Sequence, residues 1–185
     1  KATPFFYFPN GLLAMSIATT FIPEMARAVA RRDRTEFVER TELGIRLVAL
    51  LTMPASFGFL ALSRPIIGAL LQHGQFDLAA SINTARVLAG LSVGLVAYSV
   101  YLFTLRGFYA HQDTRTPFLI NCVQNLLNIA LAFALVGRFQ VLGLGIAFAA
   151  SYVVAAVVAL FVLQIKVPSF PVLRTMRSLA RMLAA

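Results

Sequence analysis

The chain has 185 residues, of which 59% are hydrophobic and only 12% are charged. Soluble domains carry about 25% charged residues, so this chain has too little charge to cover a water-exposed surface. A formal net charge of +9 would suggest nucleic-acid binding in a soluble protein. Here the basic residues lie between apolar runs, so membrane topology and anionic headgroups explain them better, and we expect no nucleic-acid partner.

The acidic residues are concentrated in one short stretch of the chain. Five of the seven lie between Glu24 and Glu42, and only Asp77 and Asp113 follow. Such an acid-poor, apolar tract is typical of a chain that is solvated by lipid. We therefore predict an all-α membrane protein, a polytopic bundle of transmembrane helices in which residues 1–185 form part of one domain. Because the chain starts inside an apolar run without an initiator Met, we expect it to be a fragment.

Five apolar segments approach the roughly 20 residues that a helix needs to cross a bilayer core. These spans are about residues 5–22, 43–62, 87–105, 118–136 and 141–165. A charged cytoplasmic loop, residues 23–42, is expected between the first two. Residues 65–72 are apolar but too short to span, which predicts a short interfacial or re-entrant helix. Residues 172–185 alternate apolar and arginine residues at helical spacing, which predicts an amphipathic surface helix or a truncated sixth span.

The basic residues predict the orientation of these spans. If the first span ends in the cytoplasm, the cytoplasmic segments hold eleven Lys and Arg residues, against two in the opposite loops between spans. The cytoplasmic set is Arg27, Arg31, Arg32, Arg34, Arg40, Arg106, Arg115, Lys166, Arg174, Arg177 and Arg181, and the opposite set is Arg64 and Arg138. Arg86 is left out because it can lie inside the third span. The positive-inside rule supports this orientation and the count of five spans.

The first span contains Pro9, Asn10 and Gly11 in the sequence Phe-Pro-Asn-Gly. Pro removes a backbone donor and Gly is flexible, so a kink or break is expected here. Broken helices often line transporter sites, which makes these three residues candidates for a substrate cavity. A purely structural kink explains them at least as well.

Arg46 is the only charged residue within the second span. It lies about one turn from the cytoplasmic end, where an arginine readily reaches the headgroups by snorkelling. The alternative is that it supplies a cation for an anionic substrate. Position alone favours snorkelling.

The loop before the fourth span contains His111 and Asp113. We interpret it as a polar interfacial turn rather than a catalytic pair, with Thr116 capping a helix that begins at Pro117. The sequence contains no H-E-x-x-H motif, P-loop or G-x-S-x-G motif. The single cysteine, Cys122, lacks the partners of a metal site. We therefore predict a protein that is not an enzyme and that uses no cofactor.

The fourth span carries a stripe of amides, Asn121, Gln124, Asn125 and Asn128. Their spacing places all four on one face of an otherwise apolar helix. Amides that face lipid are costly, so the stripe is expected to face protein or water. Two readings stay open, namely interhelical hydrogen bonding that holds the bundle together, and the wall of a hydrated substrate cavity.

Four stretches carry motifs in the order found in one transporter family. Residues 8–23 are similar to F-P-x-G…A-T-x-x-x-P, residues 44–55 to G-L-R-L…L-P-A/S, and residues 64–77 to P-I…G-x-F. The most specific match is residues 107–117, G-F-Y-A-H-Q-D-T-R-T-P, where the family reads G-F-Y-A-x-x-D-T-x-T-P. By these motifs the chain resembles the MurJ/MviN lipid II flippases of the multidrug/oligosaccharidyl-lipid/polysaccharide exporter superfamily. The charged residues that often precede the first motif are replaced here by residues 3–7, Thr-Pro-Phe-Phe-Tyr.

The resemblance implies that the chain forms the eighth to twelfth helices of the C-terminal lobe. It implies a multi-pass protein of the bacterial inner membrane that moves lipid II, the peptidoglycan precursor, to the outer leaflet by alternating access. The implied partners are this anionic lipid-linked substrate and membrane lipids, with cell-wall synthesis proteins as further candidates. The alternatives are an exporter of another lipid-linked oligosaccharide or of a drug, and a non-transporting membrane scaffold.

Overall fold

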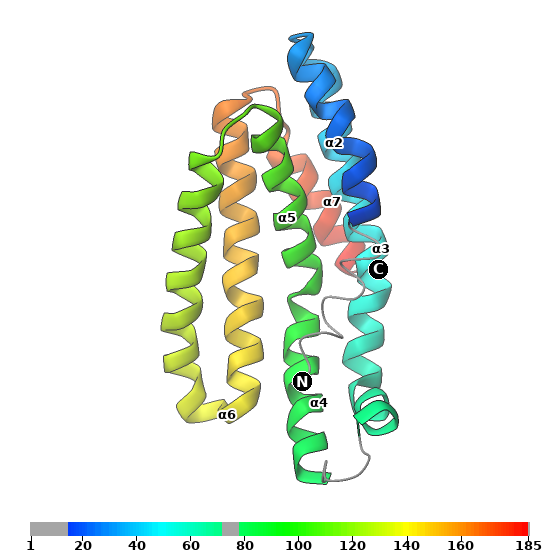
Figure 1. Ribbon diagram of the computed structural model, residues 1–185, viewed down its shortest axis with the longest axis vertical. Coiled ribbons are helices and arrows are strands. Elements are labelled where there is room, and N and C mark those ends of the chain that lie inside the picture. The colour runs from blue at the N-terminus through cyan, green and yellow to red at the C-terminus, as the bar shows by residue number, and fades with distance from the viewer. Residues whose placement is uncertain (1–14, 72–77, 185) are drawn as a thin grey trace.

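The computed structural model describes residues 15–71 and 78–184, and these residues form helices and no strand. The helices are α2 (Met15–Ala30), α3 (Arg34–Leu71), α4 (Leu78–Val93), α5 (Leu95–Ala110), α6 (Arg115–Lys166) and α7 (Val172–Ala184). Figure 1 shows them packed as an elongated bundle. The predicted all-α class is confirmed. The candidate site residues Pro9, Asn10 and Gly11 lie outside the described residues.

Helix α6 has 52 residues, and it runs along the bundle twice, as two legs of a hairpin. At 1.5 Å per residue it would be about 78 Å long, more than twice the thickness of a bilayer core. The chain instead reverses at Gln140, whose backbone angles are φ 51° and ψ −132°. Figure 1 shows the two legs side by side, from green-yellow to orange. The predicted spans 118–136 and 141–165 fall on these two legs.

The predicted span 87–105 lies on a bent pair of helices. Ser81–Val93 and Leu95–Ala110 meet at an angle of 49°, with Gly94 between them. A side chain at Gly94 would place its Cβ atom 2.7 Å from the Cα atom of Ala149. Only a glycine therefore allows the bend to lie this close to the second leg of α6.

The expected loop over residues 23–42 is wrong, because nearly all of it is helical. Helix α2 continues through Pro23 to Ala30, and α3 begins at Arg34. The Asp33 carboxylate accepts a hydrogen bond of 2.9 Å from the Glu36 backbone N–H, which caps α3. Phe37 and Met25 from this stretch are buried in the core. The charged stretch therefore forms helix ends that are packed together, and not a solvated linker.

Residues 65–71 are the C-terminal part of α3 and not a separate short helix. Pro54 and Pro65 both lie inside this 38-residue helix. Lipid offers no hydrogen-bond partners to the backbone, whereas a helix pairs its own N–H and C=O groups. Apolar segments therefore favour a continuous helix even across a proline. The remaining predicted residue of the short helix, Gln72, lies outside the described residues.

Several helical stretches are long and apolar enough to cross a membrane. In the described part of the chain these are Arg34–Ala69 and Arg115–Lys166, and the bent pair makes a third if it is one span. Large apolar side chains on the outer face of α6 are exposed, including Phe133 at 84% and Leu126 at 68%. Such exposure is expected where lipid is the solvent. The chain is a multi-pass membrane protein, while the count of five spans stays a prediction.

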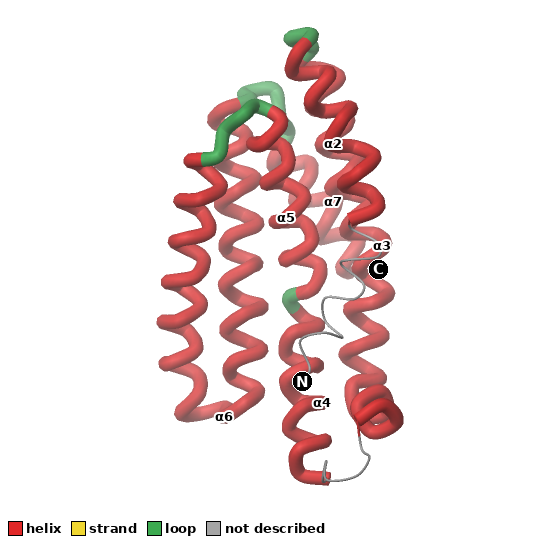
Figure 2. Tube along the Cα trace, viewed as in Figure 1, coloured by secondary structure: helices red, strands yellow, loops and turns green. Residues whose placement is uncertain are grey.

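The orientation of the bundle can be tested by cysteine labelling. Figure 2 shows the α2–α3, α5–α6 and α6–α7 loops at one end, and the reversal of α6 at the other. In a Cys122→Ala background, we expect Arg32→Cys and Thr114→Cys to react with an impermeant reagent from the cytoplasmic side. Gln140→Cys should react only from the outside. Labelling of Arg32→Cys and Gln140→Cys from the same side would contradict the orientation.

Candidate functional site

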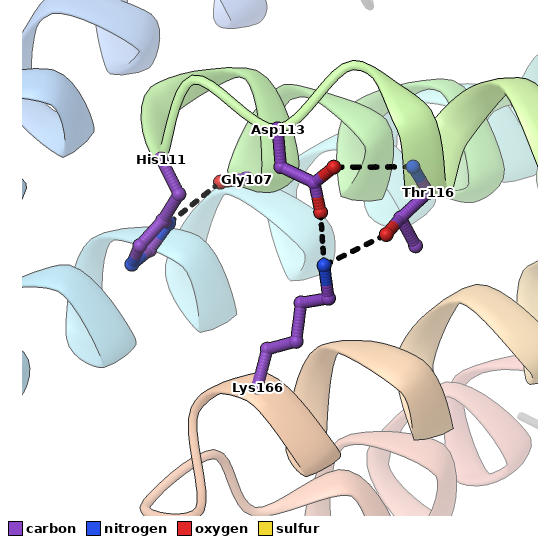
Figure 3. A network of polar contacts seen from close by, with 5 residues as sticks. All are labelled: Gly107, His111, Asp113, Thr116 and Lys166. Atoms are coloured by element: carbon purple, nitrogen blue, oxygen red, sulfur yellow. Dashed lines mark hydrogen bonds and ion pairs between the residues drawn. The ribbon is translucent and has the colours of Figure 1, made fainter.

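A polar network closes the α6 hairpin at the end where the loops gather (Figure 3). The Lys166 ammonium, at the end of α6, forms an ion pair with the Asp113 carboxylate in the α5–α6 loop. The same Lys166 Nζ donates a hydrogen bond of 2.7 Å to Thr116 Oγ1. Asp113 Oδ1 also accepts a 3.1 Å hydrogen bond from the Thr116 backbone N–H. The helix therefore begins at Arg115 with Thr114 as its N-cap residue, and the Asp113 carboxylate, one residue earlier, accepts from its first turn, so the predicted Thr116 cap is wrong.

His111 does not face Asp113 in this loop. Its Nδ1 atom lies 3.0 Å from the Gly107 carbonyl oxygen, and its ring packs edge-on against Phe37 with a centroid distance of 4.5 Å. Figure 3 shows the ring directed away from the Asp113–Lys166 pair. The two residues are therefore not arranged as an acid–base pair, and the loop is a structural turn.

Acid should weaken the Asp113 network. The Lys166 hydrogen bond holds the pKa of the Asp113 carboxyl well below its usual range. The ionised Asp113 carboxylate therefore stabilises the folded state fully above the unfolded-state pKa of about 3.9. This stabilisation is lost as the pH falls through the folded-state pKa. We expect Asp113→Asn to reduce thermal stability at neutral pH and to flatten its acid dependence. Glu39→Gln, which removes an exposed carboxylate of α3, is the control; equal acid slopes for Asp113→Asn and the wild type would contradict the expectation.

The structure divides the amide stripe between two environments. Gln124 is buried, and its Nε2 atom donates a 3.2 Å hydrogen bond to Ser151 Oγ on the second leg of α6. Its Oε1 atom is buried and has no hydrogen-bond partner. Asn121 and Asn125 are exposed, and the Asn125 side chain donates to the Asn121 backbone oxygen at 2.9 Å. Asn128 is half-buried. Gln124 thus joins the two legs, and its neighbours remain accessible.

Arg46 lies beside a basic cavity between α3 and α7. Its guanidinium forms an ion pair with Glu42, one turn earlier on α3. The cavity has a volume of about 530 Å³ and is lined by Arg46, Leu173, Arg174, Arg177, Ser178, Arg181 and Met182. We call it the α3–α7 cavity. Arg46 is therefore separated from the amide stripe, and the candidate site residues do not form one site within the described residues.

Sequence reasoning missed this gathering of arginines. Arg174, Arg177 and Arg181 are spaced at i, i+3 and i+7, which is one face of a helix. That spacing was available as a signal, but nothing in it indicates that the face lies against Arg46. The described residues bring together no group of three His, Cys, Asp or Glu side chains that could hold a metal ion.

Comparisons with known proteins point to the same family as the four sequence motifs. The family model for the lipid II flippase MurJ matches residues 2–185. A probable lipid II flippase MurJ of Rhizobium meliloti is 30% identical over 70% of this chain and 24% of its own length. The lipid II flippase MurJ of Thermosipho africanus is 26% identical over 92% of this chain and 34% of its own length. This chain thus spans about a quarter to a third of these relatives.

A solved structure of a lipid II flippase MurJ in an inward closed conformation has the same fold. It aligns with a TM-score of 0.80 over 99% of this chain and 38% of that chain, at 24% identity. The likeness extends over nearly every residue of the bundle described above.

Proposed function

The chain belongs to the MurJ family of lipid II flippases, and from this premise we propose that it serves as part of a lipid II flippase. The flippase carries the lipid-linked peptidoglycan precursor from the cytoplasmic to the outer leaflet of a bacterial inner membrane. It works by alternating access, in which helical units rock around a hydrated cavity. It is a transporter and performs no covalent chemistry.

The observation that carries this proposal is the family match over residues 2–185. The multi-pass helical fold supports it, since lipid-linked substrates are moved by proteins of this kind. The relatives named above are themselves described as lipid II flippases. Cell-wall synthesis proteins are proposed as partners because they would supply the precursor and consume it.

Within this function, the accessible amides of α6 are the proposed contacts to the polar part of the substrate. Asn121 and Asn125 are exposed, and Asn128 is half-buried. Gln124 fixes the orientation of this face through Ser151. Pro9, Asn10 and Gly11, which lie outside the described residues, remain proposed contributors to the substrate cavity. Arg46 is proposed to attract anionic groups from the cytoplasmic side.

Complementation tests the proposal. The full-length gene product is expressed in a bacterium depleted of its own lipid II flippase, and its amount in the membrane is checked. We expect growth to return, and lipid II to become accessible to a reagent that acts only at the outer leaflet. Normal membrane levels without either response would overturn the proposal. Export of a different lipid-linked oligosaccharide under the same conditions would replace it with the related exporter activity.

A further inference from the structure

We propose that the α3–α7 cavity is a binding site for the phosphate of an anionic phospholipid of the cytoplasmic leaflet. The ligand is a membrane glycerophospholipid such as phosphatidylglycerol. This inference does not depend on the transported substrate. It rests on the charge of the cavity, on the state of Arg46, and on the way in which α7 is held.

The cavity carries an excess of positive charge. Four guanidinium groups line it, from Arg46, Arg174, Arg177 and Arg181. In the described residues, one acidic side chain, Glu42, pairs with these arginines. Its carboxylate forms an ion pair with Arg46, and its Oε1 atom lies 3.9 Å from Arg174 Nε. One carboxylate cannot neutralise four cations, so the cavity attracts anions.

Arg46 has an unused donor at this site. Its Nε atom is buried and has no hydrogen-bond partner, while its Nη2 atom faces Glu42. A buried, unpartnered donor is costly. An arginine fork matches a phosphate, which can accept from both nitrogens. The Arg46 side chain is 32% exposed and lines the cavity, so a phosphate there would offer acceptors to a guanidinium whose ion pair in the described residues is with Glu42.

Helix α7 is fixed with its arginines toward the cavity. Val172 and Thr175 are fully buried, and Met176 and Leu179 pack against the main core. The opposite face holds Arg174, with a side chain that is 73% exposed. Because the apolar face anchors the helix, Arg174, Arg177 and Arg181 stay on the side of α7 that lines the cavity.

The membrane supplies the ligand that fits best. Leu173 lies at the rim of the cavity and is 72% exposed, which suits contact with the glycerol or acyl part of a lipid. In the predicted orientation α7 begins near the cytoplasmic end, where the α6–α7 loop lies, and runs beside α3 toward the middle of the bundle (Figure 1). Basic pockets between membrane helices on that side commonly bind anionic headgroups.

Lipid binding to the full-length gene product is the test. We compare phosphatidylglycerol with phosphatidylcholine by native mass spectrometry and by thermal stabilisation in nanodiscs. The double variant Arg174→Gln/Arg177→Gln is compared with Arg27→Gln/Arg115→Gln, which removes two exposed arginines outside the cavity. We expect phosphatidylglycerol to bind preferentially, and the cavity variant to bind it at least about tenfold more weakly, with the control unchanged.

Three results would overturn the inference. The first is equal binding of the two lipids, and the second is equal loss in both double variants, which would indicate general surface charge. The third is displacement of phosphatidylglycerol by excess inorganic phosphate, which would make the cavity a site for soluble anions. A lipid effect that persists in a protein unable to complement the depleted strain would support the inference while rejecting the proposed function.

Discussion

Gly145→Ala is expected to destabilise the bundle markedly, although alanine usually favours helices. A Cβ atom at Gly145 would lie 2.8 Å from Gly90 Cα and 3.0 Å from Gly90 C. These are backbone atoms and cannot rotate aside, so α4 and the second leg of α6 must separate. Overpacking of this kind typically costs about 1–3 kcal/mol. Thermal unfolding in detergent should show a clearly lowered Tm.

Gly58→Ala is the matched control for this prediction. Gly58 also lies within a long apolar helix, and a Cβ atom there would meet nothing within 4 Å. Removing a helical glycine without a clash should be neutral or stabilising, by up to about 1 kcal/mol. Equal Tm values for Gly145→Ala and Gly58→Ala would show that the two helices do not approach as closely as described.

Asn125→Leu is expected to impair transport while leaving the bundle stable. The side chain is exposed on α6 and its hydrogen bonds are to the neighbouring Asn121. Leucine therefore removes hydrogen bonds within α6, and none to another helix among the described residues. If the amide binds a charged part of the substrate, its loss costs about 1.5 kcal/mol or more, which is roughly a tenfold reduction in transport.

Gln124→Leu is the companion variant, and its expected result differs. It removes the hydrogen bond to Ser151, and such bonds within membrane bundles are worth about 0.6 kcal/mol on average. It also removes the unpaired buried Oε1 atom, so the net loss of stability should be small. Lipid II transport and the Tm of thermal unfolding are measured for four variants, Asn121→Leu, Gln124→Leu, Asn125→Leu and Asn128→Leu. If all four lose stability in step with activity, the stripe serves packing and the cavity role is wrong.

The all-α membrane class could be predicted from the sequence because lipid imposes a simple rule on the length and hydropathy of helices. The prediction of a loop over residues 23–42 is wrong because high charge does not by itself exclude a packed helix. Phe37 and Met25 lie among these charged residues and are buried in the core. The bend at Gly94 and the reversal at Gln140 are set by contacts and backbone angles that apolar runs do not specify.

The candidate site was predicted only in part, for a related reason. Four amides on one face follow directly from helical periodicity. Which of them is buried depends on Ser151, which is 27 residues away from Gln124. The α3–α7 cavity likewise joins Arg46 to residues more than a hundred positions later. Such pairings belong to the packing of the bundle and cannot be read from one segment.

The ion pair between Asp113 and Lys166 also bears on how the protein is made. The two residues are 53 positions apart and lie at the two ends of the α6 hairpin. Lys166 is synthesised at the end of the second leg. In the predicted topology, the pair can therefore form only when both legs have entered the membrane and the chain has returned to the same side. The contact therefore marks the completion of hairpin insertion during biogenesis. Until Lys166 arrives, the Asp113 carboxylate must remain hydrated at the membrane surface.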